Sequence, residues 1–332
     1  KCKYEMDDYE NALDDFNKAL ELKEDENSFY ERGLCKYQMD DYENALDDFN
    51  KALELEEDCM SFLWRGMCKY QMDDYENALD DFNKSLELDE NEHSFHERGL
   101  CKYQMKDYEN ALSDFNKAIE MNDAPEFYNF YWRGKCKYEM NDFENALPDF
   151  NKAYELNEDD KHLFLRGLCK YQMEDYENAL SDFNKAIEIN NSPGKLHFYW
   201  RGLCKYYMED YENALSDLNK AIEMNDAPTD EFFYWRGRVK YEMEDYEDAL
   251  VDLNKALELK EDDWNFYWRG MCKFAMVKDE DAVLDFNKAI ELDGENLQFL
   301  RQRGESFTQL MDWENALNDF NKIIQVEKNN SE

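Results

Sequence analysis

The chain is short of positive charge. Its 332 residues include 39 Lys and Arg against 80 Asp and Glu, so the formal net charge at pH 7 is −41. Such an excess of acid repels nucleic-acid phosphates and anionic membranes, and it favours basic partners. The sequence also lacks any run of 18 apolar residues, which a membrane-spanning helix would need. We therefore expect a protein or peptide partner, basic or rich in apolar and aromatic groups, with no nucleic acid and no membrane insertion.

Motifs for catalysis and for cofactors are missing as well. Glycine-rich phosphate loops, Cys-x-x-Cys pairs and calcium loops of the Asp-x-Asp-x-Asp-Gly type do not occur. Histidine is rare, and no nucleophile stands at a working distance from any of the four: His93, His96, His162 and His197. We interpret these as surface or groove histidines. The sequence predicts a protein that is not an enzyme and that carries no cofactor and no metal.

Apolar residues, by contrast, are plentiful and periodic. The hydrophobic fraction is 43% and the aromatic fraction 16%, too high for a disordered acidic chain. An Arg-Gly pair recurs every 33 to 35 residues, and Asp-(Phe/Leu)-Asn-Lys occurs ten times between Asp15 and Lys322. A period of this length is typical of a solenoid of stacked helix pairs. The glycines of the pairs are Gly33, Gly66, Gly99, Gly134, Gly167, Gly202, Gly237, Gly270 and Gly304.

The repeat resembles the tetratricopeptide repeat, a two-helix unit of about 34 residues. The residues that carry the resemblance in the first full unit are Phe29, Gly33, Tyr42, Ala45, Phe49 and Ala52. The resemblance implies an all-α fold, a right-handed α-solenoid superhelix of helix-turn-helix repeats. We expect one array over residues 1–326, with a partial first repeat and nine full helix pairs, followed by a polar tail at 327–332.

Helix boundaries follow from the same pattern. After a helix at Tyr9–Leu22, we predict an A helix at Phe29–Met39 and a B helix at Tyr42–Leu55, repeated along the chain. The aspartate before each B helix, such as Asp41, is predicted to cap it. Because neither end carries a polar capping helix, we expect part of a longer array, or an array whose end packs on a partner or on another copy of itself.

Nine cysteines are present, and eight of them occupy one position of the repeat. Val239 and Ser306 fill that position in the other two copies, which indicates a packing slot for a small side chain. Stacked helices lie about 8–10 Å apart, beyond the roughly 7 Å Cα separation that a disulfide spans. We predict free, buried thiols and a reducing, cytoplasmic location. The eight are Cys2, Cys35, Cys68, Cys101, Cys136, Cys169, Cys204 and Cys272.

Aromatic residues form three rows on the A helices. In the family that the chain resembles, A helices line the concave groove that receives a peptide or helix, so these rows are the predicted partner-binding residues. The first row holds Tyr30, Tyr131, Tyr199, Tyr234 and Tyr267. The second holds Tyr37, Tyr70, Tyr103, Tyr138, Tyr171, Tyr206 and Tyr241. The third, further outward, holds Trp64, Trp132, Trp200, Trp235 and Trp268. The alternative is that the rows serve packing between repeats.

Charged residues also fall at apolar borders. On a helical wheel Arg32 lies between two apolar arcs of the A helix, where an unpaired charge would be costly. Asp48 lies at the border of the B-helix stripe, and its equivalents occur in all ten B helices. We predict a ladder of partly buried Arg–Asp pairs, one per repeat, with Lys36 and its equivalents beside them. The alternative is an arginine that extends to solvent.

The resemblance and the composition together predict a non-enzymatic protein-interaction scaffold that binds a partner segment in its aromatic-lined concave groove. The alternative is an architectural subunit of a large multiprotein assembly, held through its edges and ends. Stacking and cation–π contacts in an acidic field would suit a basic, apolar or aromatic partner.

Overall fold

The computed structural model of the chain describes residues 9–329, which form nineteen helices and, within that range, no strand. Two compact units divide the chain, residues 1–169 and residues 170–332. The first unit holds α1 (Tyr9–Leu22), α2 (Glu26–Gln38), α3 (Tyr42–Leu55), α4 (Cys59–Gln71), α5 (Tyr75–Leu88), α6 (Glu92–Gln104), α7 (Tyr108–Met121), α8 (Phe127–Glu139) and α9 (Phe143–Leu156).

Helix α10 (Asp160–Gln172) contains the division between the units. The second unit continues with α11 (Tyr176–Ile189), α12 (Lys195–Tyr207), α13 (Tyr211–Glu223), α14 (Asp230–Glu242), α15 (Tyr246–Leu259), α16 (Asp263–Ala275), α17 (Asp279–Leu292), α18 (Leu297–Gln309) and α19 (Trp313–Asn329). The predicted helices at Tyr9–Leu22 and Tyr42–Leu55 are confirmed, and α19 runs beyond the predicted array end at Val326.

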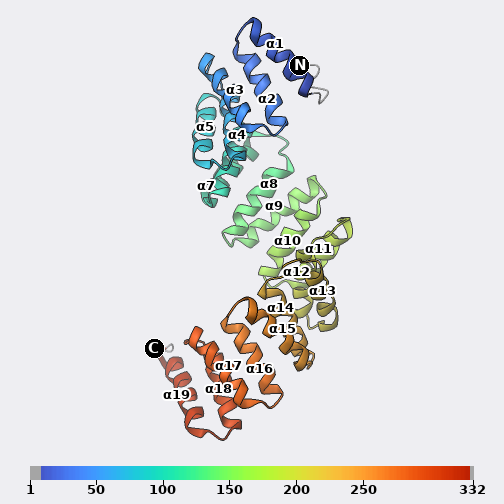
Figure 1. The fold of residues 1–332 in the computed structure, drawn as a ribbon, viewed down its shortest axis with the longest axis vertical. Coiled ribbons are helices and arrows are strands. Elements are labelled where there is room, and N and C mark those ends of the chain that lie inside the picture. The colour runs from blue at the N-terminus through green and yellow to red at the C-terminus, as the bar shows by residue number, and fades with distance from the viewer. Residues whose placement is uncertain (1–8, 330–332) are drawn as a thin grey trace. The chain divides into compact units, whose positions relative to one another are not determined.

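Within each unit the helices pack in chain order, as a solenoid requires (Figure 1). Every even-numbered helix from α2 to α8 and from α12 to α18 is an A helix, and it packs on the B helix that follows it. Successive A helices also contact each other, α2 with α4 and α12 with α14, for example, and do so more than successive B helices. The A helices therefore lie on the inner side of the stack in each unit.

The A helices begin earlier than predicted. Helix α2 starts at Glu26, not Phe29, because the Asp25 carboxylate accepts a hydrogen bond of 3.0 Å from the backbone N–H of Ser28. Asp58 caps α4 in the same way. The extra turn adds three positions to each inner helix, and these positions matter for the candidate site.

Fewer of the aspartates before the B helices accept a capping hydrogen bond than predicted. The prediction is confirmed at three positions: Asp74 and Asp175, each with a backbone bond of 3.4 Å, and Asp312, with one of 3.3 Å. It is wrong at Asp41, Asp107, Asp142, Asp210 and Asp245. Asp41, with φ −90° and ψ 67°, accepts no backbone bond of this kind. Its carboxylate instead accepts two bonds, of 2.8 and 2.9 Å, from the side-chain amide of Asn44.

Each A helix meets its B helix at a glycine. A Cβ added at Gly33 would lie 2.9 Å from the ring of Phe49, and one at Gly270 would lie 2.7 Å from the ring of Phe286. Both phenylalanines are fully buried. The recurring glycine therefore allows the backbone of the A helix to approach the buried core of its own pair, which at Gly202 and Gly237 is a leucine in place of phenylalanine.

The prediction of free, buried thiols is confirmed for the repeat-position cysteines among the described residues. Seven of them are free and fully buried, and Cys59, in its own position at the start of α4, is free and partly exposed. Burial raises the pKa of the Cys68 thiol from 9.0 to about 12. Cys2 lies outside the described residues.

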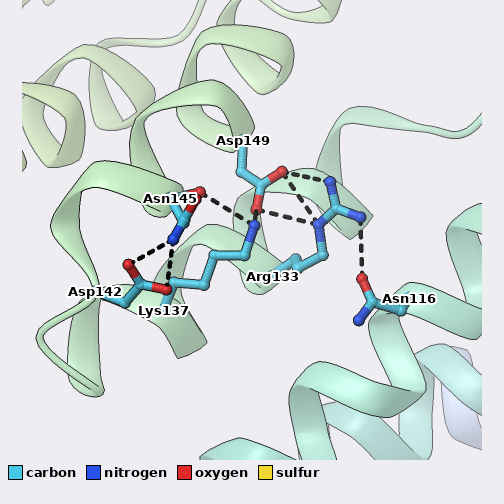
Figure 2. Close-up of polar contacts among 6 residues, drawn as sticks. All are labelled: Asn116, Arg133, Lys137, Asp142, Asn145 and Asp149. Carbon is cyan, nitrogen blue, oxygen red and sulfur yellow. Dashed lines mark hydrogen bonds and ion pairs between the residues drawn. The ribbon is translucent and has the colours of Figure 1, made fainter.

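The ladder of Arg–Asp pairs is confirmed, and Figure 2 shows one rung between α8 and α9. Arg133 Nη2 lies 2.5 Å from Asp149 Oδ1, and Lys137 Nζ lies 2.7 Å from Asp149 Oδ2. Arg133 Nη1 also donates to Asn116 Oδ1 of α7, at 3.0 Å. The same pair is present at Arg32–Asp48, Arg65–Asp81, Arg98–Asp114, Arg201–Asp217, Arg236–Asp252, Arg269–Asp285 and Arg303–Asp319.

Each rung thus joins three helices. The arginine connects its A helix to its own B helix through the aspartate and to the preceding B helix through an asparagine. The lysine, predicted to lie beside the pair, binds the same carboxylate; Lys137 also donates to the backbone oxygen of Asn145, at 3.1 Å. Asp149 is 2% exposed, so its carboxylate is bound by two cations of its own chain in place of water.

Candidate functional site

The first predicted row packs inward against the core of its own repeat. Tyr30 meets Phe49 edge-on at 5.9 Å between ring centroids, and Tyr267 meets Phe286 at 5.8 Å. Tyr131 is placed in the same way on Phe150. These rings thus help to hold each pair together, and one of them, Tyr267, is almost fully buried.

The second row packs on the first residue of the following B helix. Tyr37 lies 5.2 Å from Tyr42, and the same arrangement recurs for Tyr70, Tyr103, Tyr138, Tyr171, Tyr206 and Tyr241. The hydroxyls contact the next A helix: Gln71 Nε2, for example, donates to Tyr37 Oη at 3.3 Å. This row therefore contributes to contacts within and between repeats.

The tryptophans of the third row join neighbouring repeats. Each lies edge-on to the second-row tyrosine of the preceding repeat, with ring centroids 5.1 Å apart for Tyr37 and Trp64 and 5.0 Å apart for Tyr171 and Trp200. Trp132, Trp235 and Trp268 make the equivalent contacts with Tyr103, Tyr206 and Tyr241. Trp268 is buried, and the others keep part of their surface exposed.

In the second unit, residues from all three rows meet in one pocket of about 370 Å³. Its walls come from α12, α14 and α16 and from the last turn of α10, and this volume falls in the range of ligand-binding pockets. The predicted residues that line it are Tyr171, Tyr199, Trp200, Tyr234 and Trp235. Tyr30, in the first unit, lines a separate cavity of about 350 Å³.

The rim of the second-unit pocket is acidic. Asp230 and Glu231 stand in the first turn of α14, and Asp262 caps α16. Burial raises the pKa of Tyr199, and the nearby carboxylates of Glu231 and Asp230 raise it further. The carboxylates and the Tyr199 hydroxyl therefore border the same pocket, which can accept a cationic or hydrogen-bonding group.

Sequence reasoning missed Trp264, which also lines the pocket. It lies before the predicted start of its A helix, so it was placed in no row. The signal that would have found it is Asp262, which accepts a bond of 3.2 Å from the backbone N–H of Trp264 and starts the helix there. Trp264 then falls one turn before Trp268 on the same face.

Two cations lie among the aromatic rows. In the first unit Lys135 Nζ is 4.3 Å from the ring centroid of Trp132 and 4.8 Å from that of Tyr103. In the second unit the Arg238 guanidinium is 4.4 Å from the ring of Trp268 and 4.7 Å from that of Trp235. All four distances are within cation–π range, so the lining already accommodates positive groups of its own chain.

The interpretation of all four histidines as surface or groove residues is wrong for His96 and His162, which are buried. His96 Nδ1 lies 2.7 Å from Asn129 Oδ1, and Asn129 Nδ2 donates to Glu92 Oε1. The amide oxygen therefore faces the ring, so Nδ1 is the donor. Burial lowers the pKa of His96 to about 4, so the ring is neutral at pH 7.

Among residues 9–329, no three His, Cys, Asp or Glu side chains are grouped as metal ligands. No helix within the same range is long and apolar enough to cross a membrane.

Three family models match the chain, and each describes the tetratricopeptide repeat. One matches residues 27–59. A second matches residues 1–26, 61–92, 93–125, 128–160 and 163–193. The third matches residues 201–264. No curated protein matches the chain significantly.

Solved structures show the same fold. A tetratricopeptide repeat protein from Parabacteroides merdae is 19% identical, with a TM-score of 0.55 over 75% of this chain and 98% of its own. The C-terminal part of a repeat-containing protein from Cytophaga hutchinsonii is 18% identical, with a TM-score of 0.56 over 71% and 97%. The pilF protein of Pseudomonas aeruginosa is 18% identical, with a TM-score of 0.54 over 61% and 93%.

Proposed function

Because the chain belongs to the tetratricopeptide repeat family, whose members are protein-interaction scaffolds, we propose that it binds an extended segment of a partner protein along its A helices and has no catalytic role. The observation that carries this proposal is the aromatic pocket of the second unit. Five of the predicted residues line it, and Trp200 and Trp235 keep part of their surface exposed there. Exposed aromatic rings in a concave surface are frequent anchors of protein interfaces.

The character of the partner follows from charge. A chain of net charge −41 attracts basic segments and repels acidic ones, most strongly at low salt. The buried, free thiols support a reducing compartment such as the cytoplasm.

A photo-crosslinking amino acid tests which surface the partner occupies. Three positions separate the candidates: Glu231 at the pocket, Glu247 on the outer B helix α15, and Gln325 on α19. Crosslinks to a partner protein from Glu231, with none from Glu247, are expected. Crosslinks from Glu247 or Gln325 alone would contradict groove binding.

The architectural role is a second candidate, and an observation on α19 favours it. Leu317 is 61% exposed and Ile324 48% exposed on this helix, although Leu46, at the position equivalent to Leu317, is half-buried by the repeat that follows it. An apolar helix face of this kind suits attachment to another subunit or to a second copy of the chain. Crosslinks from Gln325 to either would support this role.

A further inference from the structure

Building on the groove function proposed above, we propose that the second-unit pocket is an aromatic cage that holds one arginine or lysine side chain of the partner segment. The cage consists of Tyr171, Tyr199, Trp200, Tyr234, Trp235 and Trp264 as walls, with Asp230, Glu231 and Asp262 at its rim. The acids bind the charge, and the rings bind its apolar stem and its cationic face.

The wall geometry suits a cation. Tyr199 and Trp200 are 5.4 Å apart and inclined at 81° to each other, and Tyr234 and Trp235 are 5.3 Å apart and inclined at 80°. Perpendicular neighbours present their faces in different directions, and the pocket is lined by both pairs, one on α12 and one on α14. A cation within about 6 Å of such faces is attracted by their electron density.

The rim supplies the matching charge. Its three carboxylates stand against one ammonium, Lys260, whose Nζ lies 3.0 Å from Asp262 Oδ2 and 4.0 Å from Asp230 Oδ2. Asp230 is 18% exposed and Asp262 29% exposed, whereas Lys260 is 58% exposed. The chain's own lysine thus marks the place where an ammonium is stabilised, and because it is the most exposed member of this group, a partner's side chain can replace it there.

Arg238 shows the same recognition within the chain. Its guanidinium lies 4.7 Å from Trp235 and 5.0 Å from Tyr206, and its Nη2 donates to Tyr206 Oη at 2.7 Å. It contacts Trp235 and Tyr234, which also line the cage, so it adds a positive charge nearby. The three rim carboxylates still exceed Lys260 and Arg238 together, and an acidic side chain would face all three. The charge balance therefore favours a basic occupant.

Selection from a random 12-residue peptide display library on the full chain tests the cage. The test variant is Asp230→Asn with Glu231→Gln, which removes two first-turn acids of α14. The matched control is Glu247→Gln with Asp248→Asn, which removes two first-turn acids of α15 on the outer face. Selected peptides are then synthesised, and the indole N–H signals of Trp200, Trp235 and Trp264 show by NMR whether each peptide occupies the pocket.

We expect peptides with at least one arginine or lysine to shift these three signals. Replacing that residue by uncharged citrulline or norleucine should weaken binding at least tenfold, as should the α14 variant, while the α15 variant binds like the wild type. Peptides without a basic residue that shift the same signals, and bind the α14 variant equally well, would overturn the cage and leave groove binding intact. Peptides that shift none of the three signals, whether or not they shift Trp313 of α19, would overturn both.

Discussion

At the scale of single residues, the turns between A and B helices contain strained positions. Nine non-glycine residues in these turns, within residues 9–329, have a positive φ between 58° and 63°, a region that L-residues avoid because the Cβ crowds the backbone. Most are Asp, Asn, Glu or Lys, but one is Val277, whose branched side chain fits this region worst. These turns need the left-handed conformation because the next N–H bonds back to the A helix: that of Asp41, for example, donates to Lys36 O at 2.9 Å.

Val277→Gly should stabilise the protein. Glycine adopts the positive φ without crowding, so we expect a gain of about 1 kcal/mol after the greater entropy of glycine in the unfolded chain is subtracted. The control is Val251→Gly, exposed inside α15, which should lose about 0.5 kcal/mol of helix propensity. Urea unfolding of both variants checks the prediction, and a loss of stability in Val277→Gly would contradict it.

Glu97 should make stability depend on pH. The structure gives its carboxylate no hydrogen bond or ion pair with any residue in the described range, and burial raises the pKa of Glu97 from 4.5 to about 7. The folded protein then holds a proton that the unfolded chain releases above pH 4.5. Stability contributed by this group is therefore complete below about pH 4.5 and is lost as the pH rises to 7, by roughly 1–3 kcal/mol.

Glu97→Gln should remove this loss and raise the unfolding midpoint more at pH 8 than at pH 5. Glu109→Gln, an exposed change of the same kind in α7, is the control and should alter stability by about 0.5 kcal/mol or less at both values. Equal gains for Glu97→Gln at the two pH values would rule out its ionisation as the cause.

At the scale of helices, the array is connected by two repeated devices. A glycine brings the A helix onto a buried phenylalanine or leucine of its partner, as Gly270 does on Phe286 and Gly237 on Leu253. An arginine then ties that A helix to the B helices on both sides, as Arg269 does through Asp285 and Asn254. Because each device acts between neighbours, a repeat is stabilised by the one before it and the one after it.

Arg133→Ala should destabilise the first unit. It leaves the buried Asp149 with Lys137 alone, so we expect a loss somewhat below the roughly 3–5 kcal/mol typical when a buried ion pair is broken. Lys152→Ala, which breaks the exposed pair with Glu155, should cost less than about 0.5 kcal/mol. Replacing Arg133 and Asp149 together by Met and Leu should recover much of the loss. Similar losses for Arg133→Ala and Lys152→Ala would show that the rungs are not stabilising ties.

At the scale of the whole molecule, the array carries one buried thiol in most repeats. The fold excludes water from these sulfurs, so burial raises the pKa of Cys68, Cys101, Cys136, Cys169, Cys204 and Cys272 to about 12. Seven of the eight described cysteines are fully buried, and Cys59 is partly exposed.

Counting the thiols that react with a reagent should distinguish the buried cysteines from Cys59. In the native state at pH 8, Cys59 should react with a thiol reagent while the other described cysteines do not, and in denaturant without a reductant all nine thiols of the chain should react. Stoichiometric disulfides in the denatured protein would contradict both the spacing argument and the reducing location.

Alkaline pH should unfold the array. Unfolded cysteines lose their protons above pH 9.0, but the buried ones keep them to about pH 12, so stability is complete below 9 and falls as the pH rises towards 12. Each of these thiols contributes about 1.4 kcal/mol of loss per pH unit in this range. Replacing Cys68 and Cys101 by Val, the residue already present at position 239, should weaken the dependence measured by circular dichroism. An unchanged dependence would place its origin in other groups.

The sequence by itself determined what repeats locally. The period of the Arg-Gly pairs, the helix at Tyr42–Leu55, the Arg32–Asp48 rung and the free Cys35 all follow from one repeat and its nearest neighbours, where helical spacing decides which side chains meet. The tertiary structure decided what depends on stacking between repeats and on backbone dihedrals. It alone placed Trp200 on Tyr171 of the preceding repeat, and it alone gathered three rows into one acidic-rimmed pocket. The reason is physical: a helical wheel gives the face of a residue, but contact across a helix stack also depends on how far and at what angle the next helix lies.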